Sequence, residues 1–158
     1  MIDINVWLAL TWDQHPQHAA AARWYASVDD AALLFCRFTM LGLLRLLTNR
    51  KVMGGSTIDV EGALDLYDRW RQDPRVDLAP EPRGTEERFR QVLGLHAREP
   101  ATKAIGDCYL AGFAEAADAR LVTFDKGLAA AAQSRGIQVA LLEPAGKAPP
   151  PSRGHYRR

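Results

Sequence analysis

Short apolar runs alternate along the chain with longer segments in which apolar residues recur at helical spacing. The runs predict strands at residues 1–3, 31–36, 76–79, 121–123 and 139–142. Helical spacing predicts helices at residues 6–10, 16–28, 39–53, 57–70, 85–99, 107–117 and from 126 onward. Because strands and helices alternate, the pattern predicts an α/β domain with a mainly parallel sheet of four to five strands.

Residues that favour helix ends mark several of these boundaries. Thr39 and Thr85 are expected at N-caps, where a hydroxyl can accept a hydrogen bond from a free backbone amide. Gly54 is expected to close the helix that Thr39 opens, and Pro100 to end the one that Thr85 opens.

The composition changes at residue 144. Three consecutive prolines begin at Pro149, and the end of the chain is polar and basic. Such a segment cannot pack a core, so we expect one domain over residues 1–143 and a flexible, proline-rich basic tail over 144–158. A chain of 158 residues is about the size of one ordinary domain.

The composition also limits the class of protein. Apolar residues make up 47% of the chain, and no apolar run reaches the ~18 residues that span a bilayer. No basic stretch followed by an apolar segment opens the chain, so a cytoplasmic protein without membrane contact is expected. Cys36 and Cys108 lie in apolar segments and form no metal-binding pair, which favours buried, reduced thiols.

The net charge of +1 conceals a basic segment. Between residues 31 and 58 there is no acid, and the basic residues there are Arg37, Arg45, Arg50 and Lys51. Such a surface can face phosphates. Arginines can equally solvate helix ends and cover the core with their stems, and the basic segment alone favours this second interpretation.

Three aspartates occupy matching places near the ends of predicted strands. Asp3 follows the first strand, Asp107 opens a helix, and Asp125 lies two residues beyond the strand that ends at Thr123. Because the carboxyl ends of parallel strands meet at one edge of a sheet, the three side chains are expected to converge there. Such a ring of acids suits Mg²⁺ and predicts phosphodiester hydrolysis. Each aspartate alone has another interpretation, as the N-cap of the following helix.

Four segments together resemble the signature blocks of PIN domains of the VapC toxin type. In chain order they are DINVWLAL (residues 3–10), FTMLGLLRLLTN (38–49), DCYLA (107–111) and LVTFDK (121–126). Each block is modestly specific, but their order and spacing together are strongly so and cover nearly all of the chain before the tail. The resemblance implies an α/β/α sandwich and the toxin of a type II toxin–antitoxin system.

The resemblance also implies an activity and a set of site residues. Proteins of this type cleave RNA with Mg²⁺ or Mn²⁺, form homodimers and are neutralised by a cognate VapB-type antitoxin. Their metal-binding acids match Asp3, Asp107 and Asp125, which are the catalytic residues expected here. Asn5 and Thr123 match polar positions that can orient these carboxylates or a water molecule. We expect a basic side chain of the antitoxin, such as arginine, to enter among the three acids.

Gly42 departs from the family pattern. Many PIN domains carry a glutamate at the corresponding position, and this chain has no acid nearby. The number of ions, one or two, is therefore open, and a single-ion site is the more cautious interpretation. Glycine can also serve to let a neighbouring element approach closely. The alternative is a catalytically weak or inactive PIN domain that binds RNA or a protein. A haloacid-dehalogenase phosphatase would need a second acid where Asn5 stands. The sequence does not show which RNA is cut, because recognition of RNA depends on the shape and charge of the binding surface.

Other candidate residues favour structural roles. His15 and His18 match zinc patterns poorly and are expected at surface or capping positions. Four tryptophans could stack on bases, but packing in the core or in a dimer is the stronger expectation. They are Trp7, Trp12, Trp24 and Trp70. The apolar surface between Leu41 and Leu47 and the helix with Trp70 are candidates for dimer or antitoxin contacts, in competition with core packing.

Overall fold

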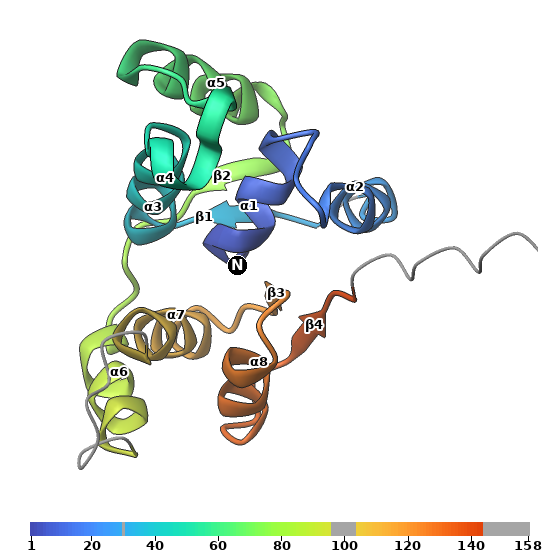
Figure 1. The fold of residues 1–158 in the computed structure, drawn as a ribbon. Helices are drawn as coiled ribbons and strands as arrows, with labels where there is room; N and C mark the ends of the chain where they lie inside the picture. Colours follow the sequence, from blue (N-terminus) through green and yellow to red (C-terminus); the bar gives the residue numbers. More distant parts are fainter. Residues whose placement is uncertain (30, 96–103, 144–158) are drawn as a thin grey trace, which may run out of the picture.

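The structure, a computed structural model, describes residues 1–29, 31–95 and 104–143. Short strands alternate with helices along these ranges, as the apolar pattern predicts. Figure 1 shows the strands in the middle of the molecule, with helices around them. The architecture is the expected α/β fold. Within the described ranges, no helix has the length and apolar character needed to cross a membrane.

The strands pair in parallel. β1 (Leu33–Phe35) pairs with β2 (Val76–Leu78), and β3 (Leu121–Thr123) pairs with β4 (Val139–Leu141). The N-terminal segment joins the two pairs, because Ile2 forms a parallel bridge with Val122 and its amide donates to Leu34 O at 3.2 Å. This segment lies between β1 and β3 in Figure 1. The first predicted strand is thus reduced to one bridging residue, while the parallel direction of the others is confirmed.

Helices surround the strands, and most of them pack in two groups. They are α1 (Ile4–Thr11), α2 (His18–Ala26), α3 (Arg37–Leu47), α4 (Arg50–Met53), the 3-10 helix η1 (Gly54–Ser56), α5 (Val60–Gln72), α6 (Thr85–Gly94), α7 (Ala104–Ala116) and α8 (Lys126–Gln133). α3, α4 and α5 lie together beside β1 and β2, whereas α6 packs on α7, which in turn contacts α8 (Figure 1).

The predicted caps at Thr39 and Thr85 are wrong in position. α3 begins at Arg37 with Cys36 as its N-cap, and Thr39 lies in the first turn, where its hydroxyl accepts from the Cys36 amide at 3.0 Å. Thr85 is the first residue of α6, preceded by Gly84 with a φ of 85°. Both threonines still lie at a helix start, but they lie inside the helix and not at its N-cap. The reason is that β1 and the turn at Gly84 lead directly into the first turn.

Two helix boundaries also differ from the prediction. The helix expected over 39–53 is divided, because α3 ends at Leu47 and Asn49 caps α4 by accepting from the Lys51 amide at 2.9 Å. α7 already includes Ala104, so Asp107 lies in its first turn rather than before it. The expected continuation of α6 to Glu99 and the tail over 144–158 lie outside the described residues.

Aromatic packing dominates the core beside β1. Trp7 of α1 is fully buried and stacks on Phe35 of β1, with ring centroids 3.7 Å apart. Trp70 meets Trp7 edge-on at 5.4 Å, and the remaining tryptophans pack against the same cluster. The core-packing interpretation of the tryptophans is confirmed. Both cysteines are free and buried, as expected.

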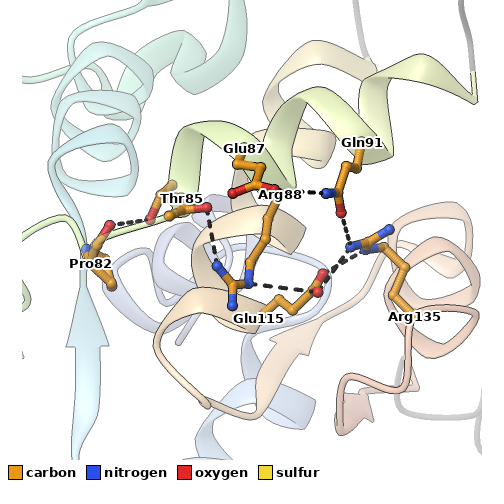
Figure 2. Close-up of polar contacts among 8 residues, drawn as sticks. Pro82, Thr85, Glu87, Arg88, Gln91, Glu115 and Arg135 are labelled. Carbon is orange, nitrogen blue, oxygen red and sulfur yellow. Dashed lines mark hydrogen bonds and ion pairs between the residues drawn. The ribbon is translucent and has the colours of Figure 1, made fainter.

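A second set of contacts fixes α7, the helix that carries Asp107. A Cβ atom added at Gly112 would lie 2.6 Å from the backbone nitrogen of Phe89, so α6 and α7 are in backbone contact there. Arg135, just beyond α8, donates to Glu115 of α7 and to Gln91 of α6 (Figure 2). The far end of α7 is therefore held by both neighbouring helices.

Candidate active site

The three predicted acids lie at the carboxyl edge of the sheet or at a helix start beside it. Asp3 follows the bridging residue Ile2 and precedes α1, and Asp125 follows β3 and precedes α8. Asp107 enters from the first turn of α7. In parallel α/β folds, sites form outside the carboxyl ends of the strands, which is where the chain places Asp3 and Asp125.

Thr123, the last residue of β3, connects two of the acids. Its hydroxyl donates to Asp3 Oδ2 at 2.6 Å and accepts from the Asp125 amide at 2.9 Å. Thr123 is fully buried and Asp3 is 6% exposed, so water does not compete strongly for this hydrogen bond. The hydroxyl therefore fixes the orientation of the Asp3 carboxylate.

Asn5 reaches the same group of atoms from α1. Its Nδ2 lies 3.5 Å from Thr123 Oγ1, and its Oδ1 accepts from the Phe124 amide at 3.5 Å. These are long hydrogen bonds. The structure thus brings both expected supporting residues together. Thr123 bonds directly to two of the acids, and Asn5 makes long contacts to Thr123 and to the Phe124 amide.

The capping interpretation accounts for only one of the three acids. Asp125 Oδ1 accepts from the amides of Gly127 at 2.7 Å and Leu128 at 3.0 Å, which is an N-cap of α8. Asp3 occupies the N-cap position of α1 but makes no side-chain cap hydrogen bond, and Asp107 lies inside α7. An N-cap hydrogen bond of this kind therefore accounts for Asp125 but not for Asp3 or Asp107, although both also lie at helix starts.

The acids interact electrostatically. The pKa of the Asp107 carboxyl is raised to about 6, mostly by burial and also by the negative charges of Asp3 and Asp125. Burial also raises the pKa of Asp3, the Asp125 charge adds to that rise, and the hydrogen bond from Thr123 opposes it. Mutual repulsion of this kind is relieved by a bound cation.

The donor set suits a hard divalent cation, although the acids do not enclose one by themselves. Among residues 1–29, 31–95 and 104–143, no three His, Cys, Asp or Glu side chains are grouped closely enough to hold an ion. Mg²⁺ does not require such a cage, because it keeps several waters and typically takes one or two carboxylates together with substrate phosphate. The carboxylate oxygens of these acids fit that requirement.

The histidines have structural partners, as expected. His15 Nδ1 accepts from the Gln17 amide at 3.2 Å, and His18 Nδ1 lies 2.8 Å from Ala9 O. Both contacts shape the turn between α1 and α2.

The structure supplies a reason for Gly42. A Cβ atom there would lie 2.5 Å from Cδ1 and 2.9 Å from Cγ1 of Ile4, the first residue of α1. Gly42 is buried and lets α3 approach α1, which is the close-approach role considered for it. A glutamate at this position would have to displace Ile4. The importance of Ile4 has no signal in the sequence, because it depends on a contact between α1 and α3.

Known proteins resemble the chain in sequence and in fold. The family model for the PIN domain matches residues 1–134. Ribonuclease VapC41 of Mycobacterium tuberculosis is 38% identical over 147 residues, which cover 90% of this chain and 97% of the relative. Ribonuclease VapC39 of the same organism is 31% identical over 147 residues, which cover 88% and 97%. The structure of VapBC-1 from nontypeable Haemophilus influenzae matches the fold with a TM-score of 0.64 at 14% identity, over 89% of this chain and 96% of that chain.

Proposed function

The chain belongs to the PIN-domain family, and on that basis we propose that it is a VapC-type toxin, an endoribonuclease whose site consists of Asp3, Asp107 and Asp125. The similarity to the VapC ribonucleases extends over nearly their whole length. The observation that carries the assignment of the site is the Thr123 hydroxyl, which donates to Asp3 Oδ2 at 2.6 Å and accepts from the Asp125 amide at 2.9 Å. The raised pKa of Asp107, due first to burial and then to the charges of Asp3 and Asp125, supports it.

The reaction is hydrolysis of an RNA phosphodiester bond. A divalent cation, Mg²⁺ or Mn²⁺, would be held by carboxylate oxygens of Asp3 and Asp107 with help from Asp125. When bound, it promotes ionisation of an attacking water and neutralises charge on the scissile phosphate. Thr123 keeps Asp3 oriented through the 2.6 Å hydrogen bond, and Asp125 uses one oxygen to cap α8, which leaves the other for the site.

A three-carboxylate site favours one ion over two. Gly42 removes the fourth acid found in many relatives of this type, and Ile4 fills the space beside it. The Mg²⁺ stoichiometry measured by calorimetry is therefore expected to be one per chain.

The proposed partner is a VapB-type antitoxin. We expect its inhibitory contact to place a basic side chain among the three acids, where charge-assisted hydrogen bonds are strong. The protein is also expected to form homodimers. On α3, Leu43 and Leu47 are buried in the core, whereas Leu41 is 55% exposed and remains available for such contacts.

The test is cleavage of single-stranded RNA by the purified protein with Mg²⁺ and with a chelator. Asp3→Asn and Asp107→Asn are expected to abolish cleavage. Asp118→Asn is the matched control, since it removes an acid outside the site at a φ of 48° that asparagine tolerates. Cleavage that survives in Asp3→Asn or Asp107→Asn would rule out the proposed site. Binding of RNA without cleavage by the parent protein would favour the inactive binding module instead.

A further inference from the structure

An exposed aromatic ring lies next to the proposed active site. Phe38, in the first turn of α3, is 36% exposed. A Cβ atom added at Gly106 would lie 2.8 Å from Phe38 Cζ, so the ring rests over Gly106, the residue before Asp107. Phe38 also packs on Tyr109, one turn further along α7, with ring centroids 5.4 Å apart. The ring is thus a partly uncovered apolar surface next to one of the three acids.

A cavity lies on Tyr109, the residue on which Phe38 packs. It has a volume of about 340 Å³ and is lined by Arg37, Tyr109, Phe113 and residues 78–81 at the end of β2 and just after it. The Tyr109 hydroxyl donates to Glu81 Oε2 at 2.6 Å, which fixes the wall that Tyr109 forms. The volume lies at the lower end of the range for small-molecule pockets, a size suited to one nucleotide.

Arg37 supplies a cation to the cavity. Its guanidinium donates to Met40 Sδ at 3.5 Å, a weak acceptor, and it forms no ion pair with any residue in the described ranges. Arg37 is therefore able to pair with a phosphate. Arg45, on the same helix two turns further along, does not line the cavity. The basic segment in the sequence thus divides into one arginine beside the site and others away from it.

We infer that Phe38 and the Arg37–Tyr109 cavity form a nucleotide subsite for the RNA strand, beside the phosphate that is cut. A base stacks on Phe38, and Arg37 contacts the phosphate of the nucleotide that occupies the cavity. The inference rests on the proposed ribonuclease function and adds to it the residues that position the substrate. Stacking of a base on an aromatic ring changes affinity by roughly tenfold, and each phosphate contact contributes about 0.7 to the salt dependence of single-strand binding.

The experiment measures RNA binding separately from cleavage. A fluorescent, single-stranded RNA oligonucleotide of randomised sequence is titrated with Asp107→Asn protein over a series of salt concentrations. In that background, Phe38→Leu is expected to weaken binding by roughly tenfold, whereas Phe38→Tyr retains it. Arg37→Gln is expected to weaken binding and to reduce the slope of log affinity against log salt by about 0.7. Arg45→Gln, the matched control, is expected to change neither quantity beyond the error.

The same substitutions in the active protein give a second readout. Phe38→Leu and Arg37→Gln are expected to raise KM for the oligonucleotide more than they lower kcat. Gly106→Ala, which pushes the Phe38 ring aside, is expected to resemble Phe38→Leu. Unchanged melting temperatures show that the variants are folded. If Phe38→Leu has lost its fold, Phe38→Met replaces it, because methionine is an adaptable apolar side chain without a ring.

Several results would overturn the inference. One is that Arg37→Gln and Phe38→Leu bind and cleave RNA as well as the control Arg45→Gln does. Another is a loss confined to the binding of an antitoxin, which would make the cavity a protein contact. A parent protein that binds RNA through Phe38 but does not cut it would refute the proposed enzymatic function and leave the subsite standing. A parent protein that does not bind RNA would refute both.

Discussion

Replacing Asp107 by asparagine is expected to stabilise the metal-free protein while it abolishes cleavage. The substitution keeps the size of the side chain and removes a charge that burial and two neighbouring carboxylates disfavour. The pKa of Asp107 is raised from 3.8 to about 6, and this shift corresponds to about 3 kcal/mol at neutral pH. Because the side chain is only partly buried, solvent screening reduces the expected gain in the free energy of unfolding to roughly 1–2 kcal/mol.

The gain must depend on pH in a particular direction. A raised pKa means that the folded state holds the proton more tightly than the unfolded state does. The parent is therefore stabilised below its unfolded-state pKa of 3.8 and loses that stabilisation as the pH rises to about 6. The variant lacks this loss, so the two proteins differ little near pH 4 and differ by the full amount above about pH 6.

Urea denaturation between about pH 4 and pH 7.5, with a chelator present, measures this difference. Added Mg²⁺ should stabilise the parent more than the variant and so narrow the gap, because an ion that binds only the folded state adds to stability. Asp118→Asn controls for the general effect of removing an acid. An Asp107→Asn protein that is no more stable than the parent at pH 7 without metal would show that the three carboxylates do not repel one another as described.

Three further substitutions test the contacts around the site. Thr123→Val removes the donor to Asp3 and is expected to cost about 1–3 kcal/mol of stability and to move the acidic limb of the pH–rate profile for cleavage to higher pH, since Asp3 ionises less readily. Gly112→Ala places a Cβ 2.6 Å from a backbone nitrogen of α6 and should lower the free energy of unfolding by about 1–3 kcal/mol in urea titrations. Gly42→Ala should be similarly destabilising alone but less so in combination with Ile4→Ala, which a double-mutant cycle measures as favourable coupling.

β1 and β3 could be predicted because each is a short, largely buried apolar run. β3 is buried at all three positions, and the apolar residues around it extend little further, so the sequence marks both ends. Helix starts were harder, as Thr39 illustrates. A threonine hydroxyl can close a helix start from the N-cap or from within the first turn, and only the backbone course after β1 decides between them.

The acids could be located from the sequence, but their roles could not be separated. Asp3 and Asp125 both follow a strand and precede a helix, yet only Asp125 caps its helix. The difference arises because the Thr123 hydroxyl holds Asp3, a contact between residues at opposite ends of the chain. The setting of Phe38 has the same origin, since its ring meets Gly106 through contacts that no local pattern records.

The charge of Asp107 is favoured by one effect and disfavoured by others, and contacts elsewhere in α7 hold the helix in place. A carboxylate in the first turn of a helix is favoured by the helix dipole, an effect of about 0.3–1 kcal/mol. Burial and the charges of Asp3 and Asp125 act in the opposite direction and raise the pKa of Asp107. The helix is held nonetheless, by backbone contact at Gly112 and by the ion pair between Glu115 and Arg135. Gly112→Ala, which forces α6 and α7 apart, loosens the helix around Asp107 and should therefore expose this carboxyl to water. Its pKa, measured by NMR titration without metal, is expected to fall toward its ordinary value because burial is the main cause of the rise.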